Sequence, residues 1–221
     1  MLSISWSYLE RVLPAIGLGF WITVQVAAGA LLVAGIVALA LTALQQALGR
    51  PAVAVTSAFV NFLRYTPVLV QLYLFYFGLP LIGIDLSAFW CGALAIGLQQ
   101  GCYASEILRS GLGSVDSRQV DAGLGLGLTR MQTLGHVMLP QAFIKSMPSL
   151  ANQGILLLKD TTIVSAIGIM ETTLTVKALS EQSGNAVPLF AIAALTFLTA
   201  TMVLGFGVRI LESRLQRRFG G

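Results

Sequence analysis

Long stretches without a single Asp, Glu, Lys or Arg run through most of the chain. Four of them lie between Arg11 and Arg50, between Arg64 and Asp85, between Asp85 and Glu106, and between Glu181 and Arg209. Each stretch is long enough for a helix that crosses the hydrocarbon core of a bilayer, which takes about 20 mostly apolar residues. The pattern therefore predicts a polytopic integral membrane protein.

Five membrane-spanning helices are predicted from these stretches and from one less apolar segment. They cover about residues 20–45, 54–77, 88–109, 149–169 and 188–210. Residues 110–148 are too polar to span the membrane and too many for a turn, and residues 171–188 are expected to form a second polar loop. The expected fold is all-α, with a single transmembrane domain over residues 1–221.

Small residues within the predicted helices indicate where two helices approach each other closely. In the first helix these residues are Gly29 and Gly35, and in the third helix Gly97 and Gly101 form a small-xxx-small pair. Trp21 is expected to anchor the outer end of the first helix at the membrane interface.

The composition agrees with a membrane protein and excludes several other classes. Of the 221 residues, 56% are hydrophobic and 10% are charged, and the mean hydropathy is +0.84, whereas a soluble domain carries about 25% charged residues. The same values exclude a disordered chain and a disulfide scaffold. The two cysteines, Cys91 and Cys102, would lie about 16 Å apart on one helix, too far for a disulfide, and are expected to be packing residues.

The placement of the positive charges predicts the orientation of the chain in the membrane. With the N-terminus outside, nine Lys and Arg residues lie on the cytoplasmic side, namely Arg50, Arg109, Arg118, Arg130, Lys145, Arg209, Arg214, Arg217 and Arg218. Only Arg11 and Lys177 lie outside. By the positive-inside rule, the C-terminus and the 110–148 loop are therefore cytoplasmic. The net charge of +4 does not indicate nucleic-acid binding, because no basic run is interleaved with aromatic residues.

The 110–148 loop is predicted to hold two short helices. Ser117 is expected to cap the first helix, and Gly125 or Gly127 is expected to end it in a left-handed conformation. Thr129 and Gln132 have the spacing of a capping box at the start of the second helix, which Pro140 is expected to stop. The pattern alone leaves two interpretations open: a lever for a cytoplasmic partner, or a loop that packs on its own bundle.

The residues of this loop favour the first interpretation. Asp121-Ala122-Gly123, Gly127, Val137 and Leu139-Pro140 resemble the EAA loop of permeases from ATP-binding-cassette importers. In that loop E-A-A is followed by three residues, G, nine residues, I, one residue and L-P, and every spacing matches here. Asp121, Gly123 and Val137 replace Glu, Ala and Ile of the pattern.

Further motifs resemble the polar amino acid uptake family of these permeases. They are Arg64-Tyr65-Thr66-Pro67 with Val70-Gln71, Tyr76-Phe77-Gly78-Leu79-Pro80, Glu106-Ile107-Leu108-Arg109, Leu139-Pro140-Gln141-Ala142 and Leu158-Lys159-Asp160-Thr161-Thr162. These matches cover about residues 60–170, and the two ends of the chain contribute only hydrophobicity and topology.

The resemblance implies a permease subunit in a bacterial plasma (inner) membrane. Two such subunits, identical or paralogous, would form one pathway for a small polar amino acid. Two cytoplasmic ATPases, which hold the ATP and Mg, would bind the EAA loops and drive alternating access, and an extracytoplasmic binding protein would deliver the amino acid. The chain contains no G-x-x-x-x-G-K-[ST] phosphate loop, so neither an enzymatic activity nor a cofactor is expected in it.

Charged residues within or beside the predicted spans are candidate functional residues. Arg64, Pro67, Lys159, Asp160 and Thr161 are candidates for the substrate pathway or its gate, because intramembrane charges are costly and often mark a pathway. A structural ion pair is the alternative for the charges of the fourth helix, and snorkelling to the interface is the alternative for Arg64.

The remaining polar residues indicate structure rather than catalysis. Glu106 and Arg109 lie three positions apart on one helix and are predicted to form a structural ion pair. His136 has no second candidate ligand near it, so no metal site is expected. No Ser/His/Asp or Cys/His arrangement is apparent in the sequence.

One alternative function remains open at this point. A small channel or secondary transporter would work without an ATPase, but it would leave the EAA spacing to chance, and the chain has no obvious inverted repeat. The sequence does not indicate which amino acid is carried, whether the dimer is formed by identical subunits, or whether this chain holds a substrate site.

Overall fold

The computed structural model describes the backbone of residues 6–48 and 50–219, and the side chains of residues 8–46 and 53–214. The described part of the chain is all-helical and contains no strand, which confirms the predicted class. The helices are α1 (Trp6–Leu48), α2 (Arg50–Tyr65), α3 (Val68–Tyr73), η1 (Leu74–Gly78), η2 (Leu79–Ile82), α4 (Ala88–Gly113), α5 (Ser117–Gly125), α6 (Arg130–Thr133), η3 (Leu134–Met138), α7 (Leu139–Asp160), η4 (Thr161–Ile167), α8 (Thr172–Ser183) and α9 (Ala186–Phe219).

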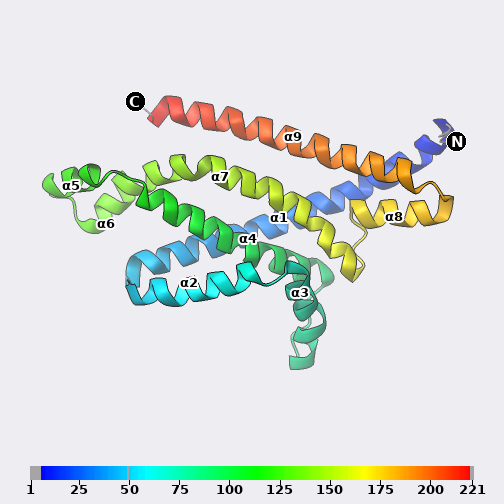
Figure 1. The fold of residues 1–221 in the computed structure, drawn as a ribbon, viewed down its shortest axis with the longest axis horizontal. Coiled ribbons are helices and arrows are strands. Elements are labelled where there is room, and N and C mark those ends of the chain that lie inside the picture. The colour runs from blue at the N-terminus through cyan, green and yellow to red at the C-terminus, as the bar shows by residue number, and fades with distance from the viewer. Residues whose placement is uncertain (1–5, 49, 220–221) are drawn as a thin grey trace.

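Helix α4 forms the centre of the bundle, with α1 and α7 packed against it (Figure 1). The main core consists of apolar side chains from α1, α3, α4, α7 and η4. Its buried members are Val26, Ala30, Ala34, Leu72, Cys91, Ala95, Ile96, Leu157, Val164 and Ile167. Both cysteines are buried and free.

Two glycines of α4 allow α1 to approach closely. A Cβ atom built on Gly97 would lie 2.5 Å from Val33 Cβ, and one on Gly101 would lie 2.7 Å from Val37 Cβ. The predicted small-xxx-small contact is therefore confirmed. Gly29 also meets a neighbour, Phe89, but the prediction for Gly35 was wrong, because its Cβ would meet nothing within 4 Å.

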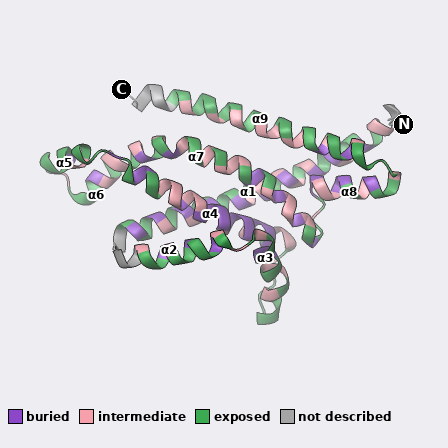
Figure 2. Cartoon of the chain, viewed as in Figure 1, coloured by how far each residue is buried: buried purple, intermediate pink, exposed green. Residues whose placement is uncertain are grey.

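Many residues of α9 are exposed (Figure 2), and large apolar side chains are among the exposed residues of both α1 and α9. Leu18, Leu39 and Val203 are each about two-thirds exposed, a pattern typical of helices that face lipid. Within the described residues, Tyr8–Gln46 and Ala186–Arg214 are long and apolar enough to cross a membrane, and two bent helix pairs raise this number to at most four. Helix α4 is not among them, so the five spans stay a prediction.

The second predicted span, residues 54–77, is not one helix. Val53–Tyr65 and Val68–Ile82 meet at an angle of 96°, and the segment from α3 to η2 projects from the bundle (Figure 1). Pro67 causes the break because it lacks a backbone N–H and disfavours a helical conformation of the residue before it. Its own backbone is extended, with φ −60° and ψ 131°.

Pro140 does not stop the second helix of the loop, contrary to the prediction. Helical structure continues from Arg130 through η3 into α7 and on to Ile167. Pro140 lies in the first turn of α7, directly after the π-helical turn η3. A proline is tolerated there because the wider π turn accommodates a residue that cannot donate a backbone hydrogen bond.

The predicted polar loop at residues 171–188 contains helix α8. Glu171 caps it, with its carboxylate oxygens accepting from the backbone N–H groups of Thr173 and Leu174 at 2.9 Å. The first and last helices are also longer than predicted. Helix α1 begins at Trp6 rather than near residue 20, and α9 ends at Phe219 rather than near residue 210. With 43 residues, α1 is about 65 Å long, roughly twice the thickness of a bilayer core.

Candidate functional site

The loop between α4 and α7 folds into two short helices at one end of the molecule (Figure 1). Asp116, not Ser117 as predicted, caps α5, because its carboxylate accepts from the N–H of Arg118 at 2.9 Å. Helix α5 ends in a Schellman motif, in which Leu128 N donates to Gly123 O and Gly127 N donates to Leu124 O. Gly127 supplies the left-handed residue, with φ +84°.

The capping box at the start of α6 is confirmed. Thr129 Oγ1 accepts from Gln132 N at 3.3 Å, and Gln132 Oε1 accepts from Thr129 N at 2.9 Å. The two capping motifs determine the direction of the chain at both sides of the Gly127 turn.

Gly123 forms the contact between the two short helices. It is buried, and a Cβ there would lie 3.1 Å from Thr133 Cγ2 and 3.5 Å from Val137 Cγ2. A glycine at this position therefore lets α5 lie close to the α6–η3 helix. Asp121 and Ala122 are exposed beside it.

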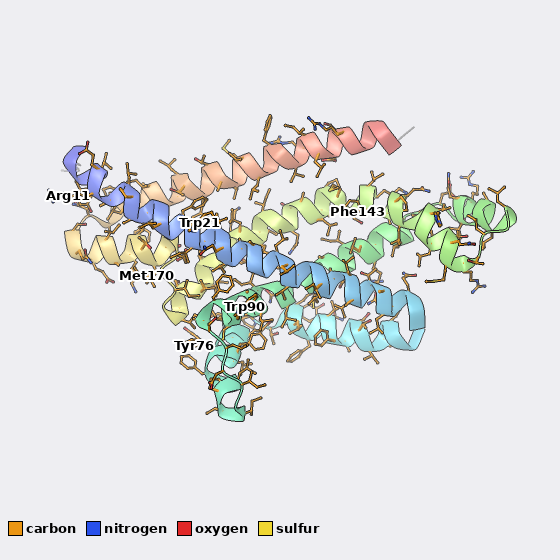
Figure 3. The ribbon with its side chains drawn as sticks, turned by 180° about the vertical axis from the view of Figure 1, so that it is seen from behind. Arg11, Trp21, Tyr76, Trp90, Phe143 and Met170 are labelled. Carbon is orange, nitrogen blue, oxygen red and sulfur yellow. The ribbon has the colours of Figure 1, made fainter. Side chains whose placement is uncertain are left out.

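The residues of the sequence motif thus separate into an inner and an outer group. Gly123 and the half-buried Val137 pack between the helices, whereas Asp121, Ala122, Gly127, Leu139 and Pro140 are exposed. Figure 3 shows Phe143, itself about half exposed, near this end of α7. A partner could therefore reach Asp121 and Ala122 without unpacking the loop.

Two glutamines satisfy the backbone at the Pro67 break. Gln71 Nε2 donates to the carbonyl oxygens of Leu63 and Thr66 at 2.8 and 3.2 Å, and Gln99 Nε2 donates to the same two oxygens at 3.1 and 2.9 Å. The last carbonyls of a helix have no partner within the helix. Side-chain amides supply the missing donors here.

Arg64 lies beside this break and against α4. Its guanidinium carbon lies 4.6 Å from the centroid of the Tyr103 ring, within the range of a cation–π interaction. Its Nε is buried and has no hydrogen-bond acceptor among the described residues. Arg64 therefore holds a buried donor that no described acceptor satisfies.

Asp160 ends α7 and contacts the other glutamine of the α4 pair. Gln100 Nε2 donates to Asp160 Oδ2 at 2.5 Å, and Gln153 Nε2 donates to Gln100 Oε1. The neighbouring side chains behave differently. Lys159 is exposed, and Thr161 is fully buried with its hydroxyl donating to Leu158 O at 2.7 Å.

Arg64 and Asp160 each contact α4: Arg64 lies against the ring of Tyr103, and Asp160 accepts from Gln100, three positions earlier on that helix. Lys159 is not part of this arrangement.

Glu106 and Arg109 form a partly exposed ion pair near the end of α4. Arg109 donates to both carboxylate oxygens of Glu106, at 3.1 and 2.5 Å. Exposed pairs of this kind contribute about 0–1 kcal/mol to stability. No group of three or more His, Cys, Asp or Glu side chains within the described residues is arranged to hold a metal ion.

Four amides organise this region. Gln71 belongs to one of the family motifs, whereas Gln99, Gln100 and Gln153 were not predicted from the sequence. The adjacent pair Gln99-Gln100 within an otherwise apolar helix was the available signal, because buried amides need partners. In Figure 3, Tyr76 lies on the projecting segment and Trp90 near the start of α4.

Residues 30–217 match the family described as "Binding-protein-dependent transport system inner membrane component". The chain belongs to this family. The permease resembles curated relatives over most of its length. It is 33% identical over 213 residues to a probable amino-acid ABC transporter permease, y4tG, of Sinorhizobium fredii. The aligned region covers 96% of this chain and 92% of the relative. It is 34% identical over 164 residues to the glutamine transport system permease GlnP of Escherichia coli, which covers 73% and 75%.

Solved structures resemble this permease over nearly its whole length. A crystal structure of an amino acid ABC transporter with histidines matches with a TM-score of 0.88 at 27% identity, covering 96% of this chain and all of the other. The MetNI methionine ABC transporter in an inward-facing conformation matches with a TM-score of 0.73 at 14% identity, covering 96% and 99%. The second likeness shows the fold alone.

Proposed function

We propose that this permease is the membrane subunit of an ATP-driven importer of amino acids in a bacterial plasma membrane. The observation that carries the proposal is the match to an amino-acid ABC transporter permease along 96% of the chain, together with a TM-score of 0.88 to an amino acid ABC transporter. Three relatives from Bacillus subtilis are also named as amino acid permeases, for L-cystine, glutamine and arginine.

The proposed topology has five crossings, with the N-terminus outside and the C-terminus in the cytoplasm. Helix α4 supplies the crossing that hydropathy alone leaves out. Its polar residues Gln99 and Gln100 lower its hydropathy, but they are buried and hydrogen-bonded inside the bundle rather than facing lipid. The positive charges support the orientation, although the side chains of Arg50, Arg217 and Arg218 lie outside the described residues.

The α5–α6 loop is the proposed docking site for a cytoplasmic ATPase, which would hold ATP and Mg and hydrolyse the ATP. The exposed Asp121 and Ala122 would contact the ATPase, with Asp121 suited to a partner arginine. Gly123, Gly127 and Val137 would hold the loop in shape, and Leu139-Pro140 would connect it to α7. Because α7 is continuous with this loop, a movement of the loop would reach Asp160 at the other end of the helix.

Arg64 and Asp160 are the proposed charges of the amino acid pathway. A zwitterion carries one carboxylate and one ammonium, and the free Nε of Arg64 and the carboxylate of Asp160 suit these two groups. Pro67 would let the segment beside Arg64 move as a gate, and Thr161 would hold the end of α7 behind Asp160. A second permease copy or a paralogue would complete the pathway, with alternating access as the mechanism, and an extracytoplasmic binding protein would supply the substrate.

The proposal is tested by capturing the tagged permease from its native membrane in mild detergent and identifying the bound proteins by mass spectrometry. Wild type is expected to retain an ATPase with a phosphate loop, and Asp121→Arg is expected to lose it. Glu181→Arg, which reverses an exposed charge on α8, is the matched control and should retain the ATPase. If wild type retains no ATPase under conditions that keep other membrane complexes intact, the importer is wrong and the channel or secondary transporter takes its place.

A further inference from the structure

Three polar side chains form a directional chain of hydrogen bonds between α7 and α4. Gln153 Nε2 donates to Gln100 Oε1, and Gln100 Nε2 donates to Asp160 Oδ2 at 2.5 Å. Gln100 is only 4% exposed. The first and last members both lie on α7, about two helical turns apart, and the middle member reaches them from α4.

The last residue of α7, Asp160, is at an unusual position for a carboxylate. It lies where α7 passes into η4, and a charge at membrane depth is costly unless it is paired. No described Lys, Arg or His side chain forms an ion pair with it. Its other oxygen, Oδ1, forms no hydrogen bond within the described part of the chain. Asp160 therefore has one oxygen held by an amide and one oxygen without a hydrogen-bond donor among the described residues.

An amide side chain presents a donor and an acceptor that exchange places when the group turns by 180°. If Gln100 turned in this way, its carbonyl oxygen would face the carboxylate and the two groups would repel each other. The N–H of Gln153 prevents this, because it needs the carbonyl oxygen of Gln100 on its own side. Gln153 thus selects the orientation in which Gln100 donates to Asp160.

We propose that Gln100 is a positioning residue for transport: it holds the Asp160 carboxylate so that Oδ1 faces the ammonium group of the passing amino acid, and Gln153 keeps Gln100 in the donating orientation. This inference rests on the function proposed above. It assigns the role of cation recognition to Asp160 and makes the affinity for substrate depend on two neutral residues that need not touch the substrate.

A purely structural bond between α4 and α7 would have a different consequence. Loss of such a bond would lower stability and transport rate whether or not Asp160 carried a charge. Loss of a positioning residue raises the KM and does so only while the Asp160 carboxylate is present. A double-mutant cycle separates the two cases.

The experiment measures ATP-driven uptake by the whole complex in proteoliposomes, with radiolabelled arginine, histidine and glutamine as the probes. Gln100→Leu is expected to raise the KM of the transported amino acid about tenfold or more, since a hydrogen bond to a charged group is removed, with the maximal rate within about twofold. Gln153→Leu is expected to raise KM in the same direction but less. In an Asp160→Asn background, Gln100→Leu is expected to add less than about a twofold change.

Gln45→Leu is the matched control, because Gln45 is also a buried amide that links two helices, donating to Thr56 Oγ1 at 2.8 Å. It should leave KM unchanged. A Gln100→Leu defect confined to the maximal rate, or one that persists undiminished beside Asp160→Asn, would overturn the positioning role. If Gln100→Leu fails to assemble, Gln153→Leu decides by the same two criteria. If wild type takes up none of the three amino acids with ATP, the proposed function itself fails, which is a result distinct from an unaltered KM in a working transporter.

Discussion

Gln71 of α3 and Gln99 of α4 donate to the same backbone oxygen, that of Leu63, at 2.8 and 3.1 Å. Both also donate to Thr66 O. Two residues from different helices thus satisfy the carbonyls released where Pro67 breaks the chain. The bend of 96° between the flanking helices is therefore held by side chains of two helices.

Replacing Gln99 by leucine is expected to destabilise the permease by about 1–3 kcal/mol, because two buried carbonyls each lose a donor. The measurement is the midpoint of thermal unfolding of the purified complex in detergent. Gln182→Leu, at an exposed position of α8, is the control and should leave the midpoint unchanged. Equal midpoints for both variants would show that the amides do not support the bend.

Substitution of Gly97 by alanine is expected to cost about 1–3 kcal/mol, because the new Cβ would overlap Val33 and the Ala30 carbonyl and force α1 away from α4. Gly35→Ala is the matched variant on the partner helix, where a Cβ meets nothing within 4 Å. It is expected to be neutral or to gain up to about 1 kcal/mol of helix propensity. Thermal unfolding of the two variants should shift in opposite directions or by clearly different amounts. A similar small shift for both would contradict the close contact of α1 and α4.

Gly127→Ala is expected to weaken both the loop and the capture of the ATPase, since a residue with φ +84° costs about 1–2 kcal/mol more for an L-amino acid than for glycine. Gly125→Ala, two residues earlier, has a negative φ and open space around its Cβ. This control should retain the ATPase and stabilise α5 slightly. Hydrogen exchange of the α5 amides, together with the amount of captured ATPase, measures both effects. Loss of the ATPase in Gly125→Ala alone would refute the role of the Gly127 turn.

The proposed orientation predicts which face of the membrane gives access to each loop. Both native cysteines are buried, so a single introduced cysteine reports its own exposure. Glu181→Cys on α8 is expected to react with a membrane-impermeant maleimide from the outside of intact cells. Arg130→Cys at the start of α6 is expected to react only after the membrane is opened. The reverse pattern would place the α5–α6 loop outside, and no cytoplasmic ATPase could then bind it.

Much of the fold was predictable because its signals are local. The charge-free stretches identified the apolar helices, the Thr129 and Gln132 spacing identified the capping box, and the Gly97 and Gly101 pair identified a close helix contact. Each depends on a few residues near one another in sequence, so no knowledge of the tertiary structure was needed.

The wrong predictions share one physical cause: hydropathy does not report whether a helix is continuous. The hydropathy of an apolar segment is the same whether its helix is straight or bent at Pro67, so residues 54–77 were predicted as one span. Conversely, Pro140 suggested an end where a π turn lets the helix continue. Residues 171–188 were predicted as a loop because they are polar. The cap that Glu171 provides for α8 was not recognised in the sequence.

The candidate site was only partly predictable for a related reason. Intramembrane charge singled out Arg64 and Asp160, since a buried charge is rare and costly. The bonds of Gln100 and Gln153 could not be predicted, because they depend on which faces of α4 and α7 meet. The same packing separates Lys159, which is exposed, from its neighbour Asp160.

The most direct test of the central claim is uptake of radiolabelled amino acid by proteoliposomes that contain the whole complex, with and without ATP on the side of the α5–α6 loop. The account predicts uptake that requires ATP and is lost in Asp121→Arg, while Glu181→Arg transports like wild type. Uptake that proceeds equally without ATP, and that Asp121→Arg leaves intact, would contradict it.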